Sequence, residues 1–268
     1  MRKFFRIFFK SIDFSKEMQY NEGINPSKET GMRVLISGGT RGIGRACVEY
    51  FAARGDRVAF LYRNRQDLAE ELSRASGALA FRADVGDPEA VRRAVSSVTE
   101  LFGGLDAVIS NAGISQIKLF TDLTDADWQQ MLGTNLSGAF HLAREAVKPM
   151  IQQKFGRVVF IGSMWGKTGA SCEVHYSATK AGLRGMTHSL AKELGLSGIT
   201  VNCVEPGVIL TDMNGELDEE TLQALKEETP VGRLGTPEEV AALVGYLCSK
   251  EAGFITGQTI GIDGGYAV

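Results

Sequence analysis

The stretch Val34-Leu-Ile-Ser-Gly38-Gly-Thr-Arg-Gly42-Ile-Gly44 decides the fold of this chain. A short apolar run predicts a strand over 33–38, and the amphipathic residues that follow predict a helix that ends at Arg54. Glycines between a strand and a helix allow a tight turn, and they let backbone N–H groups approach a pyrophosphate that the helix N-terminus also attracts. The turn therefore predicts a dinucleotide site. Its candidate cofactor-binding residues are Gly38, Thr40, Arg41, Gly42, Ile43 and Gly44.

Beyond this turn, short apolar runs rich in β-branched residues alternate with longer amphipathic stretches. The apolar runs predict strands near 33–38, 57–62, 78–83, 105–110, 157–162, 199–204 and 258–263. Strands that alternate with helices form βα units, and such units build a parallel sheet with helices on both faces. We therefore expect an α/β fold of the Rossmann type, with a single doubly wound parallel sheet of seven strands in one domain, residues 32–268. The weakly patterned residues 207–220 are the candidate mobile loop.

The composition excludes several classes of function. A net charge of -3 gives no reason to expect a nucleic-acid partner. The four cysteines form no C-x-x-C pair, which favours a reduced, cytoplasmic location and argues against a metal site. No apolar run approaches the roughly 18 residues that a membrane-spanning helix needs. These features predict an intracellular protein without a bound metal.

Residues 1–31 carry six basic and four acidic groups and lie outside the regular pattern. They predict a disordered N-terminal extension. A second interpretation stays open, because Lys3, Arg6 and Lys10 share one helical face, and a basic amphipathic helix there would touch a membrane surface or a partner. A third is a translation start at Met32, which stands directly before the first strand. None of these interpretations gives a firm membrane association.

A hydroxyl, a phenol and an amine stand close together at Ser163, Tyr176 and Lys180. Residues four apart lie on one face of a helix, so Tyr176 and Lys180 would point into the same space. A cation beside a phenol favours the phenolate and lowers the pKa, which would make Tyr176 a general acid or base. Tyr246 and Lys250 share the spacing, but they lack an upstream hydroxyl at a strand end.

The residues after the second strand select between cofactors. A carboxylate there would hydrogen-bond the ribose of NAD, but the segment 61–65 offers Arg63, Asn64 and Arg65 and no acid. Arg41 in the glycine turn adds a further guanidinium. Because such a cluster of cations suits the 2'-phosphate of NADP, the sequence favours NADP(H) over NAD.

Together these motifs resemble the short-chain dehydrogenase/reductase family across residues 32–268. The family's marks stand in order as Gly38-x-x-x-Gly42-x-Gly44, Asp84-Val85, Asn111-Ala112-Gly113, Asn135, Ser163, Tyr176-x-x-x-Lys180 and Pro206-Gly207. The resemblance implies the strand order 3-2-1-4-5-6-7 and a homotetramer. It also implies that Asp84 and Val85 lie at the adenine, and that Asn111, Ala112 and Gly113 lie beside the cofactor. The backbone at Val208 and the hydroxyl of Thr211, which follow Pro206 and Gly207, would anchor the nicotinamide end.

The same resemblance implies a catalytic tetrad of Asn135, Ser163, Tyr176 and Lys180. Ser163 would donate a hydrogen bond to a substrate carbonyl, and Tyr176 would give it a proton as hydride arrives. Lys180 would lower the Tyr176 pKa and hold the ribose, while Asn135 would hold a water that resupplies the proton.

Two substrates fit the resemblance. The segments at 232–239 and 254–258 resemble bacterial reductases of 3-oxoacyl groups on acyl carrier protein. Such enzymes tend to carry two basic residues that dock the carrier protein. Lys154 matches the first of them, but Ser197 stands at the position of the second. The segments at 118–128, 164–173 and 225–230 resemble reductases of the 5-aminopentanone modification of elongation factor P. A carboxylate at Glu173 or Glu205 would complement the amine of that substrate. A minor alternative is an NADPH-binding regulator without turnover, for which the complete tetrad would have no use.

Overall fold

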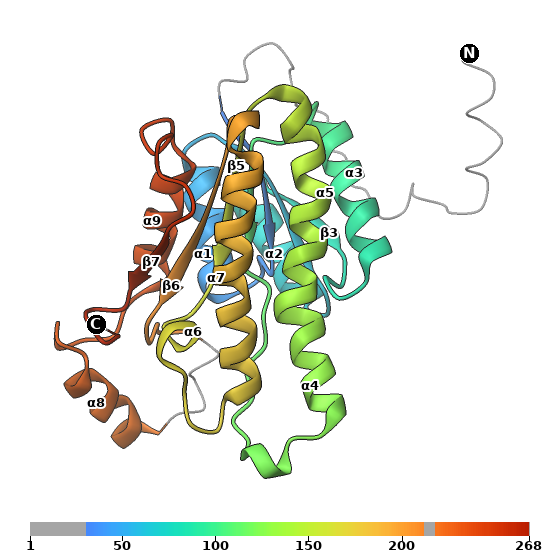
Figure 1. Cartoon of the computed structure of the whole chain (residues 1–268). Coiled ribbons are helices and arrows are strands. Elements are labelled where there is room, and N and C mark those ends of the chain that lie inside the picture. The colour runs from blue at the N-terminus through green and yellow to red at the C-terminus, as the bar shows by residue number, and fades with distance from the viewer. Residues whose placement is uncertain (1–30, 212–217, 268) are drawn as a thin grey trace, which may run out of the picture. The chain divides into compact units, whose positions relative to one another are not determined.

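Seven parallel strands form one sheet at the centre of the computed structural model, which describes residues 31–211 and 218–267 (Figure 1). The strands are β1 (Arg33–Ser37), β2 (Arg57–Tyr62), β3 (Leu79–Arg82), β4 (Ala107–Ser110), β5 (Gly156–Ile161), β6 (Ile199–Pro206) and β7 (Thr259–Ile262). Their order is β3-β2-β1-β4-β5-β6-β7, and neighbours pair in parallel. The order reverses between β1 and β4, which is where ligands bind at the carboxyl ends of such sheets.

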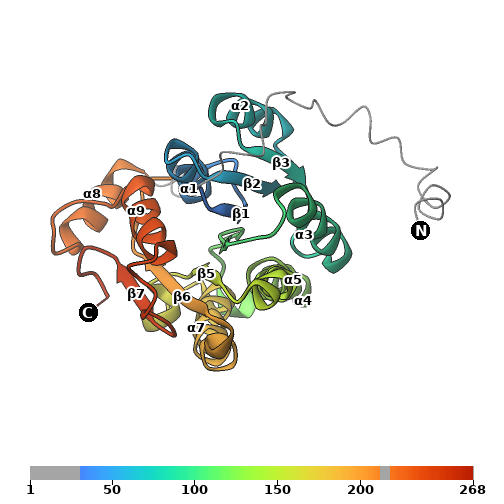
Figure 2. The same ribbon diagram turned by 90° about the horizontal axis from the view of Figure 1, so that it is seen from above.

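Helices cover both faces of this sheet, as the view from above shows (Figure 2). The helices α1 (Gly42–Ala53), α2 (Gln66–Ser76) and α9 (Pro237–Cys248) bury apolar residues against one face. The helices α3 (Pro88–Phe102), α5 (Gly138–Gln153) and α7 (Val174–Leu194) do so on the other. Strand residues alternate between the faces, so that Leu35 joins one core while Val34 and Ile36 join the other. The shorter helices are α4 (Asp125–Leu132), α6 (Trp165–Thr168) and α8 (Glu219–Glu228), with η2 (Phe120–Asp122), η3 (Gly133–Ser137) and η4 (Gly195–Ser197).

Local sequence sets several helix ends. The Asp87 side chain accepts hydrogen bonds from the N–H groups of Glu89 and Ala90, so α3 begins directly after it. The same helix stops where Gly103 adopts a φ of 72°, a left-handed conformation that glycine tolerates best. Thr124 forms a capping box at the start of α4. The caps at Asp87 and Thr124 fix the starts of the helices that follow β3 and β4, and so they end the loops at the carboxyl edge of the sheet.

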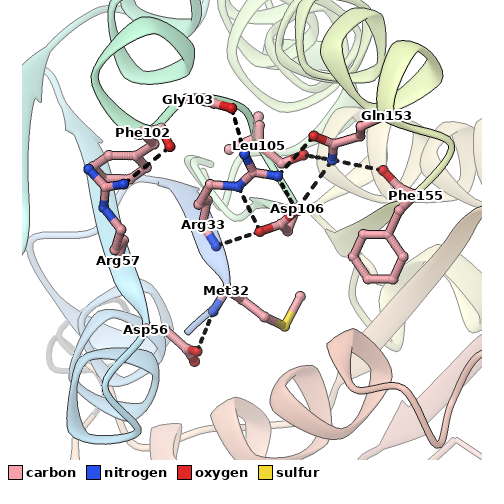
Figure 3. Close-up of polar contacts among 10 residues, drawn as sticks. All are labelled: Met32, Arg33, Asp56, Arg57, Phe102, Gly103, Leu105, Asp106, Gln153 and Phe155. Carbon is pink, nitrogen blue, oxygen red and sulfur yellow. Dashed lines mark hydrogen bonds and ion pairs between the residues drawn. The ribbon is translucent and has the colours of Figure 1, made fainter. Parts of the chain in front are cut away.

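A polar network around Arg33 holds the opposite, amino-terminal edge of the sheet (Figure 3). The guanidinium of Arg33 donates to both carboxylate oxygens of Asp106, at 2.9 and 2.6 Å, and to the Gly103 carbonyl at 2.7 Å. Gln153 at the end of α5 accepts a further hydrogen bond from Arg33 at 2.9 Å. The network ties the starts of β1 and β4 to α5.

The structure confirms the expected fold class, the sheet of seven strands and the strand order. Residues 1–30, which hold nearly all of the predicted extension, lie outside the described residues, as do 212–217 of the candidate mobile loop. The part of that loop at 207–211 is hydrogen-bonded to neighbouring segments, since Leu210 N donates to Gly235 O at 2.9 Å and Gly235 N donates to Val208 O at 3.0 Å. Among the residues that the structure describes, no helix is long and apolar enough to cross a membrane.

Candidate active site

The glycine turn packs against the end of β4 so closely that side chains would not fit. Gly38 has a φ of 66°, and a Cβ there would lie 2.9 Å from the Cα of Ala112. A Cβ on Gly44 would lie 2.1 Å from the carbonyl oxygen of Gly38. The N-terminus of α1 has no side-chain cap, which leaves its first N–H groups available to an anion. The turn therefore has the shape and the donors that a pyrophosphate requires.

Asn111 and Ser37 join the glycine turn to the loop after β4. The amide of Asn111 donates to the carbonyl oxygens of Ser37 and Gly38, at 3.1 and 3.0 Å. In return the Ser37 hydroxyl accepts from the backbone N–H groups of Asn111 and Ala112, both at 3.0 Å. Asn111 therefore shapes the cradle, and Gly113 follows with Lys180 Nζ only 3.7 Å from where its Cβ would stand.

The three predicted guanidiniums have different partners. Arg65 is engaged by Asp67, with hydrogen bonds of 3.0 and 2.8 Å at the start of α2. Arg63 lies beside the exposed Asn64 and pairs at 3.5 Å with the half-exposed Asp84. Within the described residues, Arg41 is exposed and forms no ion pair. Arg41 therefore remains for a phosphate, and Arg63 is the second candidate because its contact with Asp84, at 3.5 Å, is longer than the hydrogen bonds that Arg65 makes to Asp67.

Asp84 and Val85 follow β3 at the same edge of the sheet. The Asp84 carboxylate accepts a hydrogen bond from Gly86 N at 2.9 Å. Val85 is buried and packs so close to α5 that a Cβ on Gly138 would lie 2.7 Å from it. The pair lies at the end of β3, on the side of the glycine turn where the resemblance expects the adenine.

Ser163, Tyr176 and Lys180 meet at the end of β5. Ser163 follows that strand and is buried, and the hydrogen bond of its hydroxyl to Tyr176 favours the phenolate. Tyr176 and Lys180 stand on α7, where Lys180 Nζ lies 5.5 Å from the centre of the Tyr176 ring. The second pair with the same spacing is different, because α9 ends at Cys248 and leaves Lys250 beyond the helix that carries Tyr246.

The expected lowering of the Tyr176 pKa by Lys180 is wrong for the chain without ligands. Burial raises the pKa of Tyr176 to about 12, and this outweighs the opposite effect of Ser163. Burial also lowers the pKa of Lys180 to about 8. The Lys180 ammonium is directed to the Ile161 carbonyl, to which it donates at 2.8 Å, rather than to the phenol. Tyr176 is therefore a protonated phenol, ready to donate.

Asn135 lies in a π-helical turn, η3, between α4 and α5. Such turns are frequent at functional sites because they redirect side chains. The Asn135 side chain accepts from Ile114 N at 2.8 Å and donates to Ile114 O at 2.9 Å, which fixes the loop after β4. A Cβ on Gly113 would lie 3.4 Å from its oxygen. The structure thus brings Asn135 to the same cluster, beside the loop that contains Gly113.

The segment from Pro206 to Thr211 closes the other side of the cradle. Pro206 ends β6, and Gly207 N donates to Ile262 O at 3.1 Å. Val208 lines a cavity of about 200 Å³ together with Ile209, Thr229, Val231, Arg233, Gly235, Glu239, Ile262, Asp263 and Gly264. Thr211 returns to the glycine turn, since a Cβ on Gly42 would lie 3.2 Å from its methyl group. The glycine turn therefore lies close both to the loop after β4, through Gly38 and Ala112, and to Thr211, through Gly42.

The residues between Ser163 and Tyr176 in the sequence have different surroundings. Trp165 packs edge-on against Tyr266 with ring centres 5.7 Å apart. His175 is fully buried and hydrogen-bonds Gln116 at 3.0 Å, so it does not face a substrate. Glu173 contributes to the raised pKa of Tyr176, and burial raises the pKa of its own carboxyl.

Sequence reasoning missed two groups that shape the site. The Ser37 hydroxyl holds the loop after β4, and the Ile161 carbonyl holds Lys180. A polar residue at the buried end of a strand is the signal that could have identified Ser37, whereas a backbone carbonyl leaves no signal in a sequence.

A dinucleotide cradle beside a Ser, Tyr, Lys and Asn cluster defines an oxidoreductase that uses a nicotinamide nucleotide and acts on C=O or CH–OH groups. Comparison with known proteins agrees. The profile of a family described as Enoyl-(Acyl carrier protein) reductase matches residues 38–267. The chain belongs to the short-chain dehydrogenase/reductase family.

Relatives and solved structures of this family match most of the chain. A 3-oxoacyl-(acyl-carrier-protein) reductase FabG of Aquifex aeolicus (strain VF5) is 42% identical over 243 residues, which cover 89% of this chain and 98% of the relative. The corresponding reductase MabA of Mycobacterium tuberculosis (strain ATCC 25618 / H37Rv) is 40% identical and covers 87% and 91%. A solved double mutant of a Serratia marcescens short-chain dehydrogenase/reductase matches with a TM-score of 0.82 at 35% identity and covers 88% and 97%.

Proposed function

We propose that this protein is an NADPH-dependent reductase that converts 3-oxoacyl thioesters, carried on acyl carrier protein, into 3-hydroxyacyl thioesters. The observation that carries the proposal is the protonated phenol of Tyr176 beside the Ser163 hydroxyl, in a chain whose glycine turn suits a dinucleotide. Relatives named as reductases of 3-oxoacyl groups on acyl carrier protein support the substrate class.

Several features of the chain support NADPH as the cofactor. The glycines at 38, 42 and 44 leave room for a pyrophosphate, and Arg41 and Arg63 are the cations for a 2'-phosphate. Asp84, Val85 and the residues 111–113 border the adenosine side, and Val208 and Thr211 border the nicotinamide side. When bound, NADPH supplies the hydride.

The remaining steps are hydrogen bonds and one proton transfer. Ser163 donates a hydrogen bond to the substrate carbonyl and stabilises the negative charge that develops on its oxygen. Tyr176 gives that oxygen a proton, which its raised pKa keeps on the phenol until the far more basic alkoxide forms. Lys180 holds the ribose and stabilises the tyrosinate left behind, and Asn135 holds the loop at Ile114 and a water that resupplies the proton.

The family description names an enoyl reductase, so the test must separate reduction of a ketone from reduction of a C=C bond. An acetoacetyl thioester is a substrate for the first activity and a crotonyl thioester for the second. A phenol that protonates an oxygen bound by Ser163 suits a C=O group, so the protein should oxidise NADPH with the acetoacetyl thioester and not with the crotonyl thioester. Turnover of the crotonyl compound alone would reject the proposal. Tight NADPH binding without turnover of any ketone would favour the non-catalytic regulator.

A second candidate is reduction of the 5-aminopentanone modification on elongation factor P, and one residue favours it. Glu173 lies near Tyr176 and forms no ion pair within the described residues, so its carboxylate is available to a substrate amine. Glu205 is not available, because Arg184 holds it. Glu173→Gln should leave acetoacetyl thioester turnover unchanged and lower turnover of the modified factor about tenfold if this candidate is right.

The position of Lys154 does not favour docking of acyl carrier protein next to the active site of the same chain. It stands before β5, whereas Ser163 follows that strand at the other edge of the sheet. The six residues of β5 separate them by about 20 Å. Lys154 would therefore serve a site on another copy of the chain, which agrees with the proposed homotetramer. A cytoplasmic role in fatty acid biosynthesis follows from the proposed substrate.

A further inference from the structure

An ion pair between a partly exposed arginine and a buried glutamate joins α7 to β6. Arg184 Nη1 lies 3.0 and 2.9 Å from the two carboxylate oxygens of Glu205. The Glu205 side chain is 6% exposed and that of Arg184 is 27% exposed. Burial raises the pKa of the Glu205 carboxyl, and the guanidinium of Arg184 opposes that rise. Neither side chain has a role in the chemistry proposed above.

On the helix side, Arg184 belongs to the face that carries the catalytic residues. It stands four residues after Lys180 and eight after Tyr176, and residues at this spacing project from one side of a helix. A change in the position of Arg184 relative to the sheet would therefore move Lys180 and Tyr176 with it.

On the strand side, Glu205 packs against the residue that precedes Ser163. A Cβ on Gly162 would lie 3.1 Å from the Cγ of Glu205. Hydrogen bonds from Gly162 N to Val204 O at 2.7 Å and from Met164 N to Pro206 O at 3.0 Å flank this contact. The segment that presents Ser163 is thus held by the residues on either side of Glu205.

Lys167 and Asp263 complete a charged cluster around Glu205, which borders a cavity of about 120 Å³. The Lys167 ammonium donates to the Ala267 carbonyl, and Asp263 accepts from Gly265 N and Ala267 N at 2.9 and 3.1 Å. All four charged side chains therefore have partners inside the chain. The cluster needs no ligand, and its contacts run between β6, α6, α7 and the segment after β7.

Stability alone gives a weak reason for such a pair. The cost of removing two charges from water often matches their attraction, and apolar side chains of similar size can replace a buried pair without loss of stability. What apolar side chains do not reproduce is the directed contact of one guanidinium nitrogen with both oxygens of a carboxylate.

We propose that Arg184 and Glu205 are positioning residues, which hold Tyr176 and Lys180 on α7 at a fixed place relative to Ser163 on the end of β5. This inference rests on the catalytic roles given under the proposed function. The pair acts through those residues and touches neither substrate nor cofactor.

The double variant Arg184→Met/Glu205→Leu tests the proposal, with Arg92→Met on the exposed Arg92–Glu89 pair of α3 as matched control. The double variant should keep a Tm close to that of the wild type while kcat for ketone reduction falls about tenfold, because small misplacements of reacting groups are costly. KM and the Kd of NADPH should stay within about twofold. The control should match the wild type in every respect.

Amide hydrogen exchange supplies a measurement that does not depend on turnover. Exchange in the double variant should become faster at 162–167 and in the first turns of α7 and stay unchanged in α3. Wild-type kcat together with wild-type exchange would overturn the inference, and so would a loss of kcat explained by a matching loss of folded protein. If the wild type reduces no ketone, the proposed function is wrong. The amide hydrogen exchange of the double variant would then still test whether Arg184 and Glu205 hold α7 and the segment 162–167 in place.

Discussion

Lys180 donates a hydrogen bond to the carbonyl oxygen of Ile161 at 2.8 Å, while the same nitrogen lies 5.5 Å from the centre of the Tyr176 ring. The amine is thereby attached to the end of β5, two residues before Ser163. One strand end and one helix face hold the hydroxyl, the phenol and the amine together. Because the ammonium is buried, its charge lowers the stability of the folded chain when no ligand is bound.

The first prediction concerns the stability cost of Lys180. Its pKa of about 8 in the folded chain lies below the ordinary value of 10.5, so between these pH values the unfolded chain binds more protons and stability rises with pH. Below about pH 8 the buried charge costs up to about 3 kcal/mol. Lys180→Met should therefore abolish turnover and raise the free energy of unfolding at about pH 7, measured with urea.

The stability gain from Lys180→Met should shrink as the pH approaches the ordinary pKa of lysine, because the wild type then folds with a neutral amine. A variant that is less stable than the wild type by the same amount at every pH would show that the Ile161 hydrogen bond outweighs the desolvation of the charge.

The second prediction concerns the choice of cofactor. Arg41→Ala and Arg63→Ala should each weaken NADPH binding about tenfold, and leave NADH binding unchanged, because the contact proposed for each guanidinium is with the 2'-phosphate, which NADH lacks. Arg65→Ala is the matched control, since Asp67 already engages that side chain. Fluorescence titration with both nucleotides measures the four Kd pairs. Equal loss of NADPH and NADH affinity would contradict the assignment.

The third prediction separates crowding from backbone strain in the glycine turn. Gly38→Ala puts a Cβ 2.9 Å from the Cα of Ala112 at a φ of 66°, so it should lower stability by about 2–3 kcal/mol and abolish nucleotide binding. Gly77→Ala has a similar φ of 74° but open space around it, and should cost about 1 kcal/mol with normal binding. Equal Tm losses in thermal unfolding would show that close packing against β4 contributes nothing.

The sequence predicted the sheet well, because the strands are short, largely apolar runs between turn signals, and those from β1 to β6 other than β3 are mostly buried. Boundaries shifted by a residue or two at most strands, as at β3 and β4, where the runs are short. The site residues were found through short motifs at strand ends and helix starts, and the structure places the glycine turn, the loop after β4 and Ser163 at the carboxyl ends of their strands. Their catalytic and binding roles stay predictions.

Electrostatics and long-range pairs could not be predicted in the same way. The direction of the Tyr176 pKa shift depends on burial, which outweighs a neighbouring cation whose nitrogen is directed elsewhere. Arg184 and Glu205 are 21 residues apart and show no spacing signal, because a helix and a strand bring them together only in the folded chain.

The most direct test of the account is the rate of NADPH oxidation with acetoacetyl thioester by the wild type and by Tyr176→Phe. The substitution removes only the phenolic oxygen, so NADPH should bind with unchanged Kd while kcat falls by about a thousandfold, the middle of the range for a lost proton donor. A Tyr176→Phe variant that keeps most of the wild-type kcat would contradict the proton transfer on which the proposed function depends.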